Sequence, residues 1–376
     1  MINTKEFGEE LKKLGFQFYS GVPCSFLKNL INYAINDCEY IGATNEGEAV
    51  AIAAGAYLGG KKSVVLMQNS GLTNAVSPLV SLNYTFQLPV LGFVSLRGEA
   101  GLADEPQHEL MGQITEKMLE TMKIPHAYLA SELDVAKEQL LLAHQHIENH
   151  QSFFFVVKKG TFAKVELGEQ QQMSTANLSK LVHNRTDQLP TRYEALGVIN
   201  SFKDVDTVQL ATTGKTGREL YTIEDSPHNL YMVGSMGCVS SLGLGLALAR
   251  QDKKIVVIDG DGAMLMRMGS LATNGYHQPP NMLHILLDNN THDSTGGQLT
   301  VSHNVNFVEI AASCGYSRSI YVHNTEELAA HIQAWKEKPS LTFLYLKIAK
   351  GSIAELGRPS IKPHEVKERL RMFVNG

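Results

Sequence analysis

The sequence predicts two α/β domains, each a doubly wound, mainly parallel sheet of six strands with helices on both faces. Short apolar runs alternate with segments of helical pattern, and continuous apolar runs are typical of strands buried on both faces of a parallel sheet. This alternation occurs twice along the chain, with a polar segment between the two halves. A chain of 376 residues is too long for one ordinary core and long enough for two domains.

The first domain is expected to span residues 1–165. Helical patterns at 46–58 and 131–148 separate the predicted strands, and alternating strands and helices imply a parallel sheet. The predicted strands are 16–19, 40–43, 63–67, 90–95, 126–129 and 153–157.

The second domain, residues 190–376, repeats this scheme. The segment 166–189 is rich in Gln, Ser, Thr and Asn and is therefore predicted to be a linker. Pro190 and Thr191 then open a helix. The predicted strands are 207–210, 229–233, 255–259, 283–288, 317–321 and 341–346.

Charge and cysteine usage exclude several classes of protein. The net charge of −5 comes without a basic stripe, so we expect no nucleic-acid partner. Residues 1–14 form a charged amphipathic pattern unlike a signal peptide, and no run approaches the roughly 20 apolar residues that cross a bilayer. The four cysteines have no disulfide-framework or metal-ligand spacing, which favours a cytoplasmic location.

Polar clusters follow two predicted strands of the second half. Gly260, Asp261, Gly262 and Ala263 come after strand 255–259, and Asn289 and Asn290 follow strand 283–288. Ligands bind at the carboxyl ends of such strands, and carboxylate and amide oxygens suit Mg²⁺ shared with a diphosphate. The alternative is a turn in which Asp and Gly only bend the chain. The paired Asn residues favour the metal–diphosphate site.

Two other phosphate motifs are incomplete. Thr213, Gly214 and Lys215 resemble the end of a P-loop, but Gln209 stands where a Walker A sequence needs glycine. Gly243 and Gly245 lack the third glycine of a dinucleotide fingerprint. An NTPase is therefore disfavoured, and a non-catalytic nucleotide-binding protein remains as the alternative outside the enzymes.

Residues 260–290 resemble the cofactor motif of the thiamine-diphosphate (ThDP) superfamily that includes pyruvate decarboxylase and acetolactate synthase. The resemblance implies ThDP and Mg²⁺, a pyrimidine-binding first domain and a diphosphate-binding second domain. The implied Mg²⁺ ligands are Asp261, the side chain of Asn290 and the backbone carbonyl of His292. Ala263 replaces a serine found in many members, which keeps the backbone N–H contact and loses the hydroxyl.

The same resemblance assigns further cofactor contacts. Thr213, Gly214 and Lys215 would contact the diphosphate. Met236 would hold the bent shape of the cofactor, and the Gly234 carbonyl would accept from its amino group.

The resemblance also implies a catalytic glutamate that exchanges a proton with the pyrimidine ring. Glu46 follows the second predicted strand and has Gly55 nine residues later, which matches the family pattern. Glu48 is a rival that lacks this spacing. For either residue, the alternative is an acidic side chain favoured by the helix dipole.

The absence of a middle domain and several long runs narrow the resemblance to the phosphonopyruvate decarboxylase family. The implied reaction converts 3-phosphonopyruvate to phosphonoacetaldehyde and CO₂ in phosphonate biosynthesis. Sulfopyruvate decarboxylase and other ThDP-dependent decarboxylases or carboligases are the alternatives. The runs are 20–25, 44–56, 104–112, 213–220 and 289–298.

The substrate would be a small anionic 2-oxo acid, whose tetrahedral tip needs cationic donors. Arg97, Arg218, Lys215 and Arg358 are the candidates, and each is equally a surface cation. The resemblance further implies a homo-oligomer whose active sites are shared between subunits. Ser25 and Asn45 are further substrate-binding candidates, and His108 and His292 are candidate proton donors or anion binders.

Overall fold

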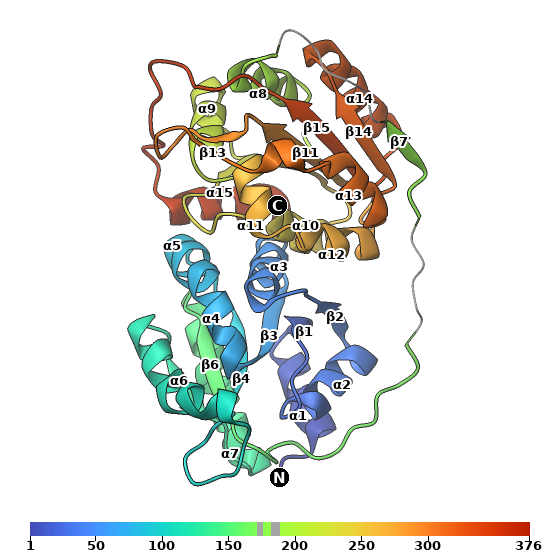
Figure 1. Ribbon diagram of the computed structural model, residues 1–376. Helices are drawn as coiled ribbons and strands as arrows, with labels where there is room; N and C mark the ends of the chain where they lie inside the picture. Colours follow the sequence, from blue (N-terminus) through green and yellow to red (C-terminus); the bar gives the residue numbers. More distant parts are fainter. Residues whose placement is uncertain (171–175, 182–188) are drawn as a thin grey trace. The chain divides into compact units, whose positions relative to one another are not determined.

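The computed structural model describes residues 1–170, 176–181 and 189–376 (Figure 1). The chain divides into two compact units, Met1–Gln171 and Gln172–Gly376. Much of the predicted linker, namely 171–175 and 182–188, lies outside the described residues. Across the described part of the chain, no helix combines the length and the apolar character that a bilayer crossing requires.

The first unit is built on a six-stranded sheet with the order β2-β1-β3-β4-β6-β5. Every neighbouring pair is parallel, so the predicted parallel sheet is confirmed, with strand ends shifted by a few residues. The strands are β1 (Phe16–Gly21), β2 (Glu39–Gly42), β3 (Lys62–Gln68), β4 (Leu91–Ser95), β5 (His126–Tyr128) and β6 (Phe153–Val157).

Helices cover both faces of this sheet (Figure 1). Successive side chains of a strand point to opposite faces. Val64 and Leu66 therefore pack with α1, α2 and α7, whereas Val65 and Met67 pack with α3, α4 and α6. The helices are α1 (Thr4–Lys13), α2 (Lys28–Asp37), α3 (Glu46–Leu58), α4 (Asn69–Pro78), α5 (Tyr84–Phe86), α6 (Glu109–Thr121) and α7 (Leu133–Glu148), with helical turns η1 (Leu79–Asn83) and η2 (Pro106–His108).

The second unit has a seven-stranded sheet with the order β7-β14-β15-β11-β10-β8-β9, one strand more than predicted. The extra strand, β7 (Ser179–Leu181), comes from the predicted linker and pairs with β14. It is a short edge strand without an apolar run, so the hydrophobic pattern did not indicate it. The other strands are β8 (Thr207–Ala211), β9 (Asn229–Tyr231), β10 (Lys254–Gly260), β11 (Met282–Asp288), β14 (Arg318–Val322) and β15 (Thr342–Lys347).

The first helix of this unit begins as predicted. Thr191 caps α8, and Glu194 completes a reciprocal capping box. A small hairpin, β12 (Thr291–His292) and β13 (Gln298–Leu299), follows β11. The helices are α8 (Arg192–Ser201), α9 (Lys215–Ile223), α10 (Val239–Ala249), α11 (Asp261–Met266), α12 (Ser270–His277), α13 (Phe307–Ser313), α14 (Thr325–Glu337) and α15 (Pro363–Asn375), with the turn η3 (Ser302–Asn304).

The strand order reverses at β1–β3 in the first sheet and at β8–β10 in the second. Open parallel sheets bind ligands outside the carboxyl ends of the strands at such a reversal. In the second unit, residues 213–215 follow β8 and residues 260–263 follow β10, whereas Asn290 follows β11. In the first unit, Ser25 follows β1, whereas Glu46 follows β2.

Candidate functional site

A polar pocket lies at the carboxyl ends of β8 and β10 in the second unit. It brings together most of the residues predicted to bind a cofactor in this half. Gly234, in the turn after β9, and Asn290 do not line it. The predicted residues that line it are Thr213, Gly214, Lys215, Met236, Gly260, Asp261, Gly262, Ala263 and His292.

Asp261 is the first residue of α11 and is buried, with 3% of its surface exposed. The hydroxyl of Thr300 donates to its Oδ2. Burial raises the pKa of the Asp261 carboxyl, and the nearby charge of Asp288 adds to this effect. Within the described residues, no ion pair involves Asp261. A buried carboxylate without a cation fits a site for a divalent metal.

Asn290 forms hydrogen bonds with the same residue, Thr300. Its Nδ2 group donates to the Thr300 carbonyl at 2.7 Å and to the Thr300 hydroxyl at 3.1 Å. Its backbone N–H donates to Asp288 Oδ1 at 2.8 Å, with a left-handed φ of 56°. Because the amide NH₂ is held by Thr300, the amide oxygen is the remaining group of this side chain for a cation.

His292 is the last residue of β12 and lies next to the turn of the β12–β13 hairpin. Its carbonyl accepts from the N–H groups of Thr295 at 3.1 Å and Gly297 at 3.0 Å. The Thr295 hydroxyl also donates to this carbonyl, at 3.2 Å. A metal-ligand role for the carbonyl therefore competes with three hydrogen bonds, and it stays a prediction. The ring packs closely on Gly262, where an added Cβ would lie 2.5 Å from His292 Cε1 and 3.2 Å from Met236 Cε.

A buried ion network holds the loop after β11, and the sequence did not indicate it. Arg192 Nη2 lies 2.6 Å from Asp293 Oδ2, and its Nη1 lies 3.3 Å from Glu219 Oε1. Asn289 Nδ2 also donates to Asp293 Oδ2 at 2.6 Å. Burial raises the pKa of Glu219 despite Arg192. For Asp293, burial opposes the shift, but hydrogen bonds from Arg192 and Thr291 lower the pKa.

Helix α9 forms another wall of the pocket. Gly214 is its N-cap residue and has a φ of 93°, which favours glycine. Lys215 Nζ donates to the Ser352 hydroxyl at 2.9 Å. Arg218, less than one turn further on, lines a neighbouring pocket together with Arg358. These two predicted cations therefore lie close to the cofactor residues.

In the first unit, Glu46 is the first residue of α3 and is 8% exposed. Asn45 is the N-cap residue, and its side chain accepts from the Glu48 N–H at 3.0 Å. Asn74 of α4 donates from Nδ2 to Glu46 Oε2 at 2.8 Å. A Cβ on Gly71 would lie 2.0 Å from Glu46 Oε1. The sequence did not indicate Asn74 or Gly71, because they follow a different strand.

Glu48, the rival glutamate, has a different environment. It is fully buried, and its Oε2 accepts from the Thr44 backbone N–H at 2.7 Å and from the Thr44 hydroxyl. This contact closes the first turn of α3 in the manner of a capping box. The geometry therefore gives Glu48 a role in the helix start, which supports Glu46 as the reactive carboxylate.

The remaining predicted residues of this unit lie after β1 and β4. Arg97 Nη1 donates to the Ser25 hydroxyl at 3.1 Å. Its other nitrogens form a two-point contact with Asp104, which includes a 2.7 Å bond from Nε. The hydrogen bond from Arg97 holds the pKa of Asp104 well below its usual range. Asp104 therefore already neutralises the charge of Arg97, which makes this guanidinium less suited to bind a substrate anion.

His108 ends the turn η2 and is buried, with 7% exposure. Its Nδ1 atom finds no hydrogen-bond partner among the described residues. The carbonyl of His108 packs against Gly98, where an added Cβ would lie only 2.0 Å away. Gly98 thus allows the segment that carries His108 to return to the carboxyl end of β4.

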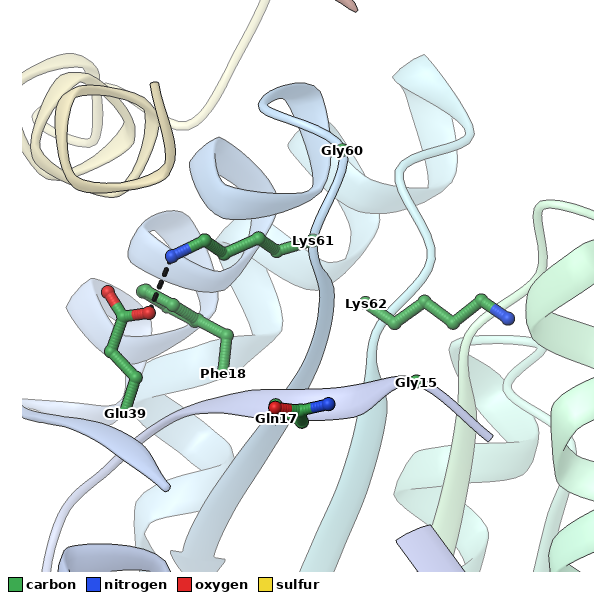
Figure 2. A pocket seen from close by; sticks show the side chains of 7 residues that line it. All are labelled: Gly15, Gln17, Phe18, Glu39, Gly60, Lys61 and Lys62. Atoms are coloured by element: carbon green, nitrogen blue, oxygen red, sulfur yellow. Dashed lines mark hydrogen bonds and ion pairs between the residues drawn. The ribbon is translucent and has the colours of Figure 1, made fainter. Parts of the chain in front are cut away.

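A different pocket lies at the amino ends of the strands of the first sheet and contains none of the predicted site residues (Figure 2). It lies where β1, β2 and β3 begin. Lys61 pairs with Glu39 at 2.5 Å, and Lys62 pairs with Glu148 at 2.7 Å. Its lysines are already neutralised, so its charges do not favour an anionic ligand.

Comparison with known proteins matches both units to cofactor-binding families. Residues 5–119 match the thiamine pyrophosphate enzyme N-terminal TPP binding domain, and residues 212–345 match the corresponding C-terminal TPP binding domain. The benzoylformate decarboxylase structure from Polynucleobacter necessarius covers 95% of this chain and is itself fully covered. The TM-score is 0.75 at 13% identity, which supports the fold alone.

Two curated relatives are similar over nearly the whole chain. Phosphonopyruvate decarboxylase from Streptomyces hygroscopicus is 40% identical, across 100% of this chain and 94% of the relative. Sulfopyruvate decarboxylase from Methanosarcina acetivorans is 29% identical, across 96% of this chain and 95% of the relative.

Proposed function

The chain belongs to the phosphonopyruvate decarboxylase family of thiamine pyrophosphate enzymes, and we propose on this basis that it converts 3-phosphonopyruvate to phosphonoacetaldehyde and CO₂. It would thus act as a carbon–carbon lyase in phosphonate biosynthesis. The observation that carries this proposal is the 40% identity over the full chain, against 29% to the sulfopyruvate relative.

The residues present fit ThDP and Mg²⁺. Asp261 and Asn290 would hold the metal, with the His292 carbonyl as a third ligand. Thr213, Gly214 and Lys215 border the pocket where a diphosphate would lie, and Gly262 leaves room beside Met236. When bound, ThDP supplies the electron sink that makes loss of CO₂ from a 2-oxo acid feasible.

The protein's own part in the chemistry centres on Glu46. Its carboxyl group would exchange a proton with a ring nitrogen of the cofactor's pyrimidine. Asn74 donates to one carboxylate oxygen at 2.8 Å and so fixes the orientation of the group. Because Gly71 has no side chain, the other carboxylate oxygen of Glu46, Oε1, has room beside it. His108 and His292 are the proposed proton donors to the reacting carbon, and Ser25 and Asn45 are proposed substrate contacts.

A side-by-side assay of aldehyde release tests this function. Purified protein with ThDP and Mg²⁺ is given 3-phosphonopyruvate, 3-sulfopyruvate or pyruvate at equal concentrations. Clear preference for phosphonopyruvate is the expected result. Preference for sulfopyruvate would overturn the substrate and keep the cofactor assignment. No turnover of any of the three, with ThDP bound, would overturn the proposed reaction.

The family resemblance further suggests a homo-oligomer in which each active site takes its glutamate from one subunit and its diphosphate pocket from another. Mixing Glu46→Gln protein with Asp261→Asn protein tests this arrangement. Because a mixed dimer would contain one intact site, subunit exchange should restore about a quarter of wild-type activity. No recovery after proven exchange would contradict the shared site.

A cytoplasmic location is proposed from cysteine chemistry. No disulfide joins the four cysteines, all of which lie within the described residues. Free thiols persist in a reducing compartment. Fractionation of the producing cells, with a cytoplasmic marker as control, tests the location.

A further inference from the structure

A second pocket of about 470 Å³ adjoins the cofactor pocket in the same unit. The two share Thr213, Gly214 and Ser294 in their walls. The other side is formed by the end of β9 and by the segment that leads into α15. Among the residues that the structure describes, no Asp or Glu lines this pocket, and its charged lining residues are Arg218 and Arg358. The pocket therefore offers positive charge to a small ligand beside the cofactor site.

Hydrogen bonds hold the segment between β15 and α15 against α9. Lys215 binds the Ser352 hydroxyl, and Tyr221 binds the Ser360 hydroxyl at 3.1 Å. Between these contacts, Arg218 donates from Nε to the Gly357 carbonyl at 2.8 Å and from Nη2 to the Leu356 carbonyl at 2.6 Å. Arg218 thereby fixes the two residues that immediately precede Arg358.

The two arginines retain donors for a ligand. Arg358 is exposed and forms no hydrogen bond or ion pair with the described part of the chain. The Nη1 group of Arg218 likewise has no partner there, since its bonds to the segment use Nε and Nη2. Arg97 differs, because Asp104 already occupies its guanidinium. Among the four predicted cations, Arg358 is thus the one that lines a pocket and lacks a partner.

We infer that the pocket bordered by Arg218 and Arg358 binds the tetrahedral anionic tip of the substrate, with Arg358 as the principal donor. This assignment rests on the proposed decarboxylase function and specifies where its substrate is recognised. A planar guanidinium offers paired N–H groups that match two oxygens of a phosphonate or sulfonate. Arg218 has a second role, because it positions the segment that carries Arg358.

Binding of phosphonoacetate tests the site independently of turnover. This compound carries the phosphonate and lacks the 2-oxo group that reacts. Calorimetric titrations into the ThDP- and Mg²⁺-loaded protein compare wild type, Arg358→Gln and Lys350→Gln. Lys350 is an exposed cation at the start of the same segment, outside the pocket lining, so its variant removes an equal charge.

We expect Arg358→Gln to weaken phosphonoacetate binding at least about tenfold and Lys350→Gln to leave it nearly unchanged. Arg358→Lys should recover part of the loss, because it restores the charge without the planar fork. Equal losses in the Gln variants, no loss in Arg358→Gln, or no binding to wild type would each overturn the inference. A wild-type protein that binds phosphonoacetate but turns over no 2-oxo acid would overturn the proposed function and leave the anion site standing.

Discussion

Asn74 Nδ2 lies 2.8 Å from Glu46 Oε2 and donates a hydrogen bond to it, which joins the start of α3 to α4, the helix that follows β3. Nearby, Glu48 is held by Thr44 at the start of the same helix. Two glutamates only two residues apart therefore have separate roles. This difference allows the proposed chemistry to be tested with closely matched variants.

Glu46→Gln should abolish nearly all turnover while ThDP affinity stays close to wild type, because the amide keeps the shape of the side chain but cannot take up and release a proton near neutral pH. Steady-state assays and cofactor titrations measure both quantities. Glu48→Gln serves as the control. It should retain most activity and lower the stability of the fold, since it weakens the cap. Wild-type turnover in Glu46→Gln would refute the catalytic assignment.

Gly71→Ala should lower kcat by roughly tenfold or more, because the added Cβ would lie 2.0 Å from Glu46 Oε1 and must displace the carboxyl group. The loss of activity should be larger than any loss of unfolding free energy, since alanine is more favourable than glycine in a helix by up to about 1 kcal/mol. Gly197→Ala in α8 is the control, because its new Cβ meets nothing within 4 Å. Equal activity in the two variants would count against a precise position for Glu46.

Asp261→Asn should abolish the rise in melting temperature that Mg²⁺ and ThDP give to the wild type at pH 7. The metal-free variant should be at least as stable as the metal-free wild type. Burial raises the folded pKa of Asp261, so the wild-type carboxyl destabilises the fold as pH rises from the unfolded pKa through the folded one. Asparagine removes that charge. Thermal melts with and without both ligands measure these effects, and an undiminished cofactor shift would exclude Asp261 as a ligand.

Arg192→Met should lower the unfolding free energy by roughly 3–5 kcal/mol, because it leaves the buried Glu219 and the largely buried Asp293 without their cation. Urea titration at pH 7 measures the change. Arg250→Met, at the more exposed pair Arg250–Asp252, is expected to cost no more than about 1 kcal/mol. Adding Asp293→Asn to Arg192→Met should recover part of the loss. Similar losses for Arg192→Met and Arg250→Met would contradict a buried network.

The hydrophobic pattern was sufficient to predict the twelve main strands and the parallel sheets. It could not indicate β7, because an edge strand of three residues buries too little apolar surface to produce a run. The motif after β10 was likewise sufficient to predict that Asp261 and Gly262 line a pocket, because the carboxyl ends of parallel strands lie on the same side of a sheet.

Contacts between distant segments were beyond sequence reasoning. Arg192 starts a helix about 100 residues before Asp293, and no local pattern links the two. Asn74 and Gly71 lie in an ordinary helical segment until folding brings them against Glu46. The signal that could have been followed was their position directly after a strand at the reversal of the sheet order.

The most direct test of the central claim is a ³¹P NMR spectrum of 3-phosphonopyruvate incubated with the protein, with ThDP and Mg²⁺ each omitted in turn. The phosphonoacetaldehyde resonance should grow only when both are present. Unchanged phosphonopyruvate in the presence of protein saturated with ThDP and Mg²⁺ would contradict the proposed reaction, and so would aldehyde formed at full rate after the cofactor has been removed.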